Sequence, residues 1–220
     1  FHRTVDFLFP TPNIKYYNHI KSIKPQESHM KKLVLFIALL FIGTAHANSS
    51  NFNTYVGIDM GANISEYNYN LDLDEIYYSA TLNAGLRIGH NFGAELFFTH
   101  SSSNSLEYIS DFDAVEHEIY YMAFGFDIYA YYNMTRQASL FTSFGVANYK
   151  IYYKSDYVNL YNSYEEKESD NTVTTRLGLG FIYTFPSDGI SILAQYQYTP
   201  LNNVLFNNMS EFSVGFRYNF

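Results

Sequence analysis

The stretch SATLNAGLRIGH, residues 79–90, decides the fold, because polar and apolar residues alternate along it. Leu82 and Leu86 fall on one side of an extended chain, whereas Asn83 and Arg87 fall on the other. Successive side chains of a β-strand point to opposite faces of its sheet, and a helix would instead need apolar residues every three to four positions. The pattern therefore predicts a β-strand with one apolar face and one polar face.

Further segments show the same two-residue period, so that eight strands are predicted in all. Their spans are 54–63, 79–90, 93–100, 119–133, 138–150, 172–185, 190–199 and 209–220. Several of these strands exceed the roughly five to six residues that are usual in globular proteins. They match instead the roughly 9–11 residues with which a tilted strand crosses a bilayer.

The connections between these strands are alternately short and long. Short turns rich in Asn, Pro, Asp and Gly lie at 90–92, 133–137 and 186–189, and longer polar connections lie at 64–78, 101–118, 150–171 and 200–208. Transmembrane barrels have this asymmetry, with brief periplasmic turns, long extracellular loops and an even number of strands. We therefore predict an all-β fold, an eight-stranded antiparallel up-and-down transmembrane β-barrel formed by residues 48–220.

The polar face of each strand is expected to line the barrel. In lipid the apolar face points outward, and an eight-stranded barrel encloses little more than its own side chains. Acids and bases on the polar face are nearly balanced, so we expect an ion-pair network that fills a closed lumen. Its members are Asp59, Arg87, Glu95, Asp127, Arg176, Glu211 and Arg217. The alternatives are a conducting pathway or a catalytic carboxylate among these residues.

Tyrosines near the strand ends are expected to form aromatic girdles at the two membrane–water interfaces. A tyrosine ring combines an apolar body with a polar hydroxyl, which suits the headgroup level of a bilayer. The chain has 23 Tyr and 20 Phe but no Trp, so these two residue types would supply the anchoring. The tyrosines concerned are Tyr55, Tyr77, Tyr78, Tyr129, Tyr131, Tyr132, Tyr149, Tyr152, Tyr153, Tyr183, Tyr196 and Tyr198.

Residues 30–47 have the three parts of a secretory signal peptide: a basic start, an apolar run at 33–43 and a small-x-small cleavage site. The cleavage site is formed by Ala45, Ala47 and Asn48, so the mature chain is expected to begin at Asn48. Residues 1–29 precede a complete signal peptide and begin with Phe, and we interpret them as a mistranslated leader that is not part of the fold.

The composition excludes several functional classes. The chain has no Cys, which removes disulfide scaffolds, thiolate zinc sites and cysteine nucleophiles. Its formal net charge of −8 argues against nucleic acid as a partner, and no stretch approaches the roughly 20 apolar residues of a membrane-spanning helix. Neither His90 nor His117 has a second ligand at metal-binding spacing, and Gly-rich phosphate loops are absent, so we expect no metal and no cofactor.

The last segment, FSVGFRYNF at 212–220, resembles the carboxy-terminal assembly signal of bacterial outer-membrane barrels. The residues that carry this resemblance are Phe212, Val214, Phe216, Tyr218 and Phe220. With the signal peptide and the eight segments, the chain is similar to the small outer-membrane β-barrel family of opacity-type and OmpA/OmpX-type surface proteins. This resemblance implies recognition by the barrel-assembly machinery and insertion into the outer membrane of a Gram-negative bacterium, in contact with lipid and lipopolysaccharide. We expect a monomer.

Three functions of different class remain open. The first, which we expect, is a non-enzymatic surface protein whose acidic external loops serve adhesion to host surface molecules, interaction with other partners, or envelope structure. The second is a small porin. A secreted, water-soluble β-domain with its aromatic face inside is the alternative to a membrane barrel.

The third function is a lipid-hydrolysing enzyme. His100 and Ser102 lie two positions apart on an extended segment and therefore face the same, lipid side. They faintly resemble the His-x-Ser of outer-membrane lipid A deacylases, in which a histidine activates a serine for acyl transfer. Glu107 or Glu118 would have to orient the histidine.

Overall fold

The computed structural model describes residues 52–67, 75–109, 113–159, 163–186, 189–203 and 205–220. The expected leader at 1–29 and the expected signal peptide, including Ala45, Ala47 and Asn48, lie outside the described residues, so both remain predictions. No helix in these described ranges is long and apolar enough to cross a membrane.

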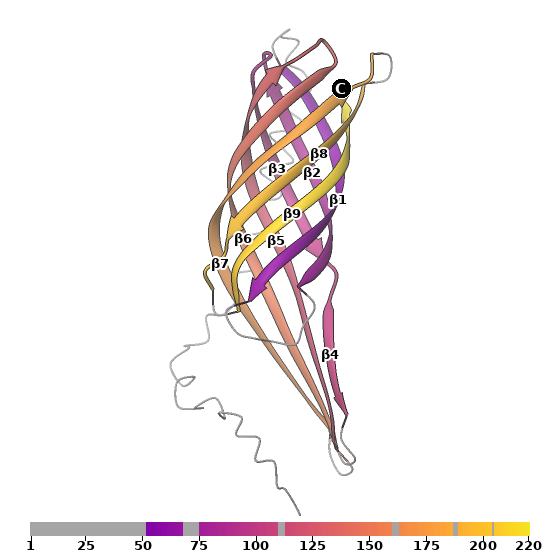
Figure 1. Ribbon diagram of the computed structural model, residues 1–220, viewed down its shortest axis with the longest axis vertical. Helices are drawn as coiled ribbons and strands as arrows, with labels where there is room; N and C mark the ends of the chain where they lie inside the picture. Colours follow the sequence, from indigo (N-terminus) through magenta and orange to yellow (C-terminus); the bar gives the residue numbers. More distant parts are fainter. Residues whose placement is uncertain (1–51, 68–74, 110–112, 160–162, 187–188, 204) are drawn as a thin grey trace, which may run out of the picture. The chain divides into compact units, whose positions relative to one another are not determined.

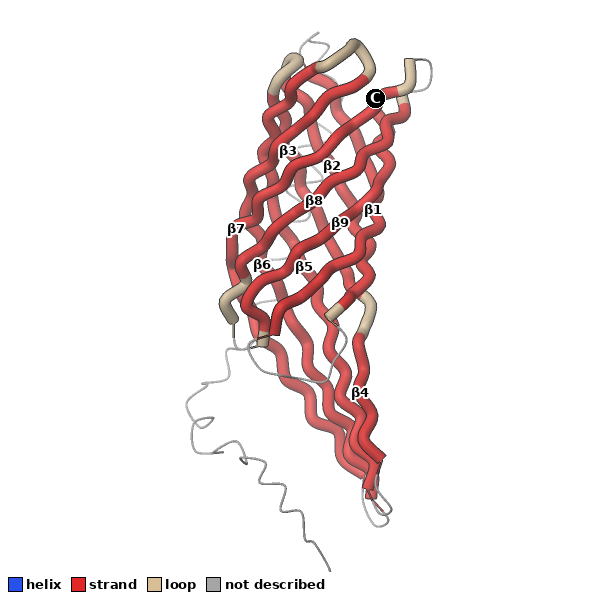
Figure 2. The backbone as a smooth tube through the Cα atoms, in the orientation of Figure 1, coloured by secondary structure: helices blue, strands red, loops and turns tan. Residues whose placement is uncertain are grey.

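The described ranges form nine β-strands, which Figure 1 labels. They are β1 (Phe52–Tyr67), β2 (Ile76–Ile88), β3 (Phe92–Ser101), β4 (Asn104–Ile109), β5 (Asp113–Asn133), β6 (Ala138–Asn159), β7 (Ser163–Thr184), β8 (Ile190–Pro200) and β9 (Phe206–Asn219). All neighbours are antiparallel, in the order β3–β2–β1–β9–β8–β7–β6–β5, and β5 pairs again with β3. Eight strands thus close an up-and-down barrel, which confirms the predicted fold class (Figure 2).

The barrel closes where its first strand meets its last. β1 and β9 are paired from Tyr55 opposite Asn219 to Tyr67 opposite Phe206, with an irregularity near the long-loop end. The N–H of Phe220 also donates a hydrogen bond of 2.9 Å to the carbonyl oxygen of Thr54. Closure pairs the backbone groups that an open sheet would leave exposed at its two edges.

Large apolar side chains cover the outside of the barrel, and polar side chains point inward. Leu82, Leu179 and Phe216 are 60%, 60% and 62% exposed, whereas Asn83 and Arg217 are buried. A water-soluble protein would bury such side chains, and a bilayer solvates them, so this exterior is suited to lipid. The predicted orientation of the two strand faces is therefore confirmed.

Four strands continue past the rim of the barrel as a sheet that we call the protruding sheet (Figure 1). It consists of β4, residues 113–118 of β5, residues 151–159 of β6 and residues 163–171 of β7. β4 follows β3 after a short break at Ser102 and Ser103, and it pairs with β5. This sheet extends the walls of the barrel on the side of the long connections.

The long polar connections expected at 101–118 and 150–171 lie beyond the barrel, and over most of their length they form paired strands. Exposed polar residues lie on both faces of the protruding sheet, such as Glu165 and Lys167 on one face and Glu166 and Glu168 on the other. Its strands therefore show no apolar period from which a strand would be predicted.

Candidate functional sites in the lumen and the protruding sheet

Arg217 of β9 lies at the centre of the polar lumen, where it joins carboxylates from two other strands. Its Nη2 donates to Oδ2 of Asp59 at 2.9 Å, its Nη1 donates to Oδ1 of the same carboxylate, and its Nε donates to Oε2 of Glu95 at 3.2 Å. Asp59 also accepts a hydrogen bond of 2.7 Å from Asn83 Nδ2, and Glu95 accepts one of 2.9 Å from the hydroxyl of Tyr129. The arginine therefore ties β9 to both β1 and β3.

A second buried pair joins β7 to β5. Nη2 of Arg176 lies 3.3 Å from Oδ2 of Asp127 and donates to Oε1 of Gln197. The Arg176 guanidinium also covers the ring of Phe97, with 3.8 Å between its Cζ and the ring centroid. This cation is thus held by a carboxylate, an amide and an aromatic face at once.

These two ion pairs compensate two carboxylates that the strand register places side by side. Glu95 of β3 lies directly opposite Asp127 of β5, and neighbouring carboxylates in a buried site repel each other. Glu95 is paired with Arg217 and Asp127 with Arg176, so each acid has its own cation. All four side chains are at most 5% exposed.

The other two charged residues expected in the lumen lie away from these pairs. Arg87, near the short-turn end, donates to the carbonyl oxygen of His90 at 2.9 Å and to Oδ1 of Asn133 at 2.6 Å, and it stacks over Tyr131. Glu211 accepts a hydrogen bond of 2.9 Å from Ser79. Neither residue has an ion-pair partner within 4.0 Å in the described part of the chain.

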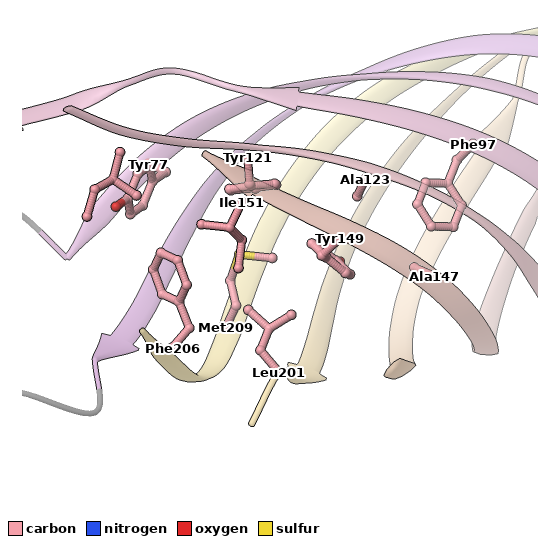
Figure 3. Close-up of a cluster of buried hydrophobic side chains, with 11 residues drawn as sticks. Tyr77, Phe97, Tyr121, Ala123, Ala147, Tyr149, Ile151, Leu201, Phe206 and Met209 are labelled. Carbon is pink, nitrogen blue, oxygen red and sulfur yellow. The ribbon is translucent and has the colours of Figure 1, made fainter. Parts of the chain in front are cut away.

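Much of the lumen is filled by apolar and aromatic side chains. Tyr77, Phe97, Tyr121 and Tyr149 belong to a buried cluster toward the protruding sheet, which Figure 3 shows. A smaller cluster contains Tyr129, Tyr131, Phe141 and Leu193. The prediction of girdle positions was therefore wrong for the buried tyrosines Tyr55, Tyr77, Tyr129, Tyr131 and Tyr149.

The alternation of side chains along each strand is the signal that would have placed these tyrosines. Tyr129 is two residues from Asp127, and Tyr149 is four residues from Gly145, so each shares the inward face of its strand. Tyr78, Tyr132, Tyr196 and Tyr198 have the opposite parity and are exposed on the outside. Outward tyrosines such as these are available for the membrane interface.

The filled lumen leaves little space for a ligand or for ions. A cavity of about 30 Å³ lies among Tyr55, Arg87, Glu95, Tyr129 and other inward residues. Such a volume accommodates one or two water molecules. No group of three or more His, Asp or Glu side chains that could hold a metal ion occurs in the described ranges.

One face of the protruding sheet, which we call the outer face, continues the lipid-facing side of the barrel and carries paired charges. Lys154 Nζ lies 2.6 Å from Asp156 and 3.3 Å from Glu165, and Lys167 Nζ lies 2.8 Å from Glu165. The hydrogen bond with Asp156 raises the pKa of Lys154, and the hydrogen bond from Lys167 is the main cause that lowers the pKa of Glu165. These pairs are solvent-exposed, so each stabilises the sheet only slightly.

The other face, which we call the axial face, continues the lumen-facing side. Glu166, Glu168 and Asp170 of β7 share this face with Arg176 and are exposed. Their neighbours across the ladder on β6 are the uncharged Ser155, Tyr153 and Ile151. The two lysines of the sheet, Lys154 and Lys167, have the opposite parity, so the positive charge of the sheet is confined to the outer face.

His117 is the titratable group at the middle of the axial face. Its Nδ1 lies 2.7 Å from the hydroxyl of Tyr153 and 2.9 Å from that of Ser155, and its ring stacks on Tyr153. Partial burial lowers the pKa of His117 from its usual value of 6.5. The neutral imidazole is thus favoured in the folded sheet.

His100 and Ser102 lie on the exposed outside, as the parity of the segment indicates, but they engage different partners. The His100 ring stacks on Tyr120 of β5, and Ser102 Oγ accepts a hydrogen bond of 3.1 Å from the N–H of Tyr78. His100 lies opposite Met122 in the ladder, and Glu118 is four residues farther along β5, which is about 13 Å. The side chain of Glu107 lies outside the described residues.

The residues of the expected assembly signal form one outward row on β9. They are Phe212, Val214, Phe216, Tyr218 and Phe220, which are all more than half exposed. In the folded barrel this strand is paired on both sides, with β1 and with β8. Both backbone edges of β9 are therefore hydrogen-bonded within the barrel, and this row of apolar side chains is what β9 presents to the outside.

The comparisons with known proteins agree with this architecture. A model of the outer membrane protein beta-barrel domain family matches residues 34–220. Among solved structures, the chain is similar to Ail, the attachment invasion locus protein of Yersinia pestis, with 15% identity, a TM-score of 0.51, and coverage of 77% of this chain and 99% of that chain. The same values hold for Ail in complex with the heparin analogue sucrose octasulfate.

Neisserial surface protein A is also similar, with 12% identity and a TM-score of 0.48 over 78% of this chain and 98% of that chain. A comparison with curated protein sequences finds no significant match. At these identities the solved structures show the fold alone, and the family model shows the relationship. The chain therefore belongs to the outer membrane protein beta-barrel domain family and is a protein of the bacterial outer membrane.

Proposed function

We propose that this protein is a surface-interaction protein, in which the barrel is an inert anchor and the protruding sheet makes the contacts. The observation that carries the proposal is the continuation of β4, β5, β6 and β7 beyond the barrel as a paired sheet. A lumen filled by ion pairs and aromatic rings has no evident transport role, whereas the sheet carries exposed charged side chains on both of its faces.

The sheet is suited to binding because it is held rigidly by the barrel. Its three longest strands run without interruption from the membrane-spanning part, so the ladder that closes the barrel also fixes the sheet. A preorganised surface loses little conformational entropy when a partner binds. The attachment invasion locus protein shares this barrel fold, and its name supports attachment as the class of function.

The enzyme alternative has less support. Acyl transfer by a serine needs a base within hydrogen-bond reach and a third group that orients the base. His100 instead stacks on Tyr120, and Ser102 accepts a hydrogen bond from the backbone at Tyr78. The porin alternative is disfavoured by the filled lumen, because the cavity next to Arg87 and Glu95 has room for only one or two waters.

The proposal is tested by shortening the sheet without touching the barrel. In the trimmed variant, residues 104–118 and 151–171 are each replaced by a short Asn-Gly turn, and bacteria displaying wild type or variant are compared for adhesion to cultured epithelial cells. We expect adhesion to fall to the level of bacteria without the protein. A control variant with a shortened β8–β9 connection at 201–205 should adhere like wild type.

Both variants must first show the shift between boiled and unboiled samples on SDS gels that marks a folded barrel. Trimmed bacteria that adhere as well as wild type would refute the proposed function. Loss of adhesion in the control variant alone would move the contact surface to the β8–β9 connection and would also refute it.

A further inference from the structure

Two tyrosines on the outside of the protein lie against each other where β5 and β6 enter the protruding sheet. Tyr120 of β5 and Tyr152 of β6 are direct partners in the ladder. Their ring centroids are 4.7 Å apart, and the planes of the two rings differ by 11°. Two phenol rings are therefore stacked across neighbouring strands, within the separation at which aromatic pairs attract each other.

This pair belongs to a row of side chains that crosses three strands. The ring of His100 on β3 is stacked on Tyr120, with 6.0 Å between the centroids and 17° between the planes. Nζ of Lys150 lies 4.8 Å from the ring centroid of Tyr152. Contacts between aromatic side chains across strands, and between a cation and a ring, are attractive. They hold both phenol rings in their stacked arrangement.

The other ring contacts between two tyrosines of the described residues lie in the lumen. They are Tyr77–Tyr121, Tyr121–Tyr149 and Tyr129–Tyr131, with centroids 5.8–6.1 Å apart. Each of these five side chains is at most 8% exposed, and Figure 3 shows three of them within the buried cluster. Tyr120 and Tyr152 are instead half-buried on the outer side of their strands, where small solutes reach them.

Exposure alone does not give a tyrosine a partner. Tyr132, also on the outer side of β5, is 71% exposed, but its ladder neighbour on β6 is Leu140. A radical formed on Tyr132 therefore has no second phenol beside it in the ladder. A radical on Tyr120 has Tyr152 in contact with it.

We propose that Tyr120 and Tyr152 are an oxidative cross-linking site, at which one-electron oxidants couple the two phenols into dityrosine. Each phenol loses one electron and one proton and becomes a phenoxyl radical. The two radicals then form a carbon–carbon bond between one Cε atom of each ring. The hydrogen on each coupled carbon moves to the oxygen of its own ring, which restores both phenols. Two electrons have passed to the oxidant and two protons to water.

The new bond would tie β5 to β6 at the base of the protruding sheet. The ladder between these two strands continues on both sides of the pair, so the bond would join segments that are already neighbours. A covalent link of this kind restricts the unfolded chain and stabilises the folded one. The cross-linked protein is therefore expected to unfold at a higher temperature than the untreated protein.

The experiment illuminates the full barrel, in detergent micelles, with ruthenium tris-bipyridyl and persulfate. The photo-oxidised ruthenium takes the electrons from tyrosine, and persulfate is finally reduced to sulfate. Dityrosine is followed by its blue fluorescence, and the linked peptides are identified by mass spectrometry after digestion. We expect the main cross-link to join Tyr120 to Tyr152 within one molecule, with a mass that is two hydrogen atoms below the sum of the two peptides.

Three matched variants locate the site. Tyr120→Phe and Tyr152→Phe each keep a ring in the stack but remove one phenol, and we expect both to lose most of the dityrosine fluorescence. Tyr132→Phe removes a more exposed phenol and should keep it. The shift between boiled and unboiled samples first shows that each variant is folded. After oxidation, this shift should persist to a higher temperature in wild type but not in Tyr152→Phe.

Cross-links formed mainly between molecules, or mainly at another pair of tyrosines, would overturn the inference. So would undiminished fluorescence in Tyr152→Phe. An unchanged melting temperature of the cross-linked wild type would overturn the stabilising role of the bond.

Discussion

Phe97 of β3 lies directly opposite Gly125 of β5, and its ring occupies the space that a side chain at position 125 would need. A Cβ added to Gly125 would lie 2.5 Å from Cζ of Phe97 and 2.5 Å from the carbonyl oxygen of Val146. The same arrangement recurs where Tyr55 covers Gly85. Glycines on the inward face thus make room for the aromatic side chains that fill the lumen.

Gly125→Ala is expected to destabilise the barrel by about 1–3 kcal/mol, because the carbonyl oxygen of Val146 belongs to the backbone and cannot simply rotate away. Gly93→Ala is the graded control, since its added Cβ would lie 3.0 Å or more from Tyr131 and Leu86. Urea unfolding in detergent, followed by circular dichroism, measures both. Equal stability of Gly125→Ala and wild type would contradict the packing described here.

Arg217→Met should cost about 3–5 kcal/mol, because it leaves the carboxylates of Asp59 and Glu95 buried without their cation. Arg136→Met removes the same charge from an exposed turn and should change stability by less than about 0.5 kcal/mol. The boiled-versus-unboiled gel shift across a temperature series compares the two. Similar melting of both variants would show that the lumen charges contribute no more than exposed ones.

Leu179→Arg tests the orientation toward lipid. Leu179 is 60% exposed near the middle of the membrane-spanning part of β7, where an arginine costs about 2–4 kcal/mol. Thr175→Arg lies on the same face, four residues closer to the protruding sheet, and should cost about 0–1 kcal/mol. Folding yields into liposomes measure the difference. A protein that tolerates arginine equally at both sites would not be embedded as described.

The pKa of His117 is lowered by partial burial, so the unfolded sheet binds this proton more readily than the folded sheet does. The sheet should therefore be most stable above pH 6.5 and lose stability as the pH falls through that value. Amide hydrogen exchange of the β5 and β6 extensions at pH 7.5 and pH 5.5 would show this loss. His117→Gln should reduce the difference, and stronger protection at pH 5.5 would contradict the assignment.

The lumen should not conduct ions, because Arg176, Phe97 and the buried cluster around Tyr149 fill its cross-section. Purified protein in planar bilayers is expected to give no stepwise currents. Replacing Phe97, Tyr121 and Tyr149 together by alanine should open a leak if the barrel still folds. Stable single-channel steps from the wild type would refute a closed lumen.

The sequence predicted the barrel because most of its strands have one face in lipid and one in a narrow lumen. Leu82 and Asn83 illustrate this: adjacent in the chain, they meet opposite environments, and the period is visible in the residues themselves. The extensions at 113–118, 151–159 and 163–171 were not predicted as strands, because polar residues occur on both of their faces and no contrast in polarity results.

The lumen was predicted only in part. Charged residues such as Asp59 and Arg217 can be assigned inward because lipid excludes them. Tyr129 and Tyr149 are chemically acceptable both at a membrane interface and inside a barrel, so their type does not decide their place. Which acid lies near which arginine depends on the shear of the ladder, and this register is set by contacts that one sequence does not display.

The β1–β9 seam also fixes the order in which the molecule can be made. β1 is paired on both sides only when β9 is present, and the N–H of Phe220 adds a hydrogen bond to Thr54 next to this ladder. The barrel can therefore close only once β9 has been synthesised, and until then the edge of β1 that faces β9 lacks its partner strand. Loss of β9 as a whole would leave an open sheet with β1 and β8 at its edges.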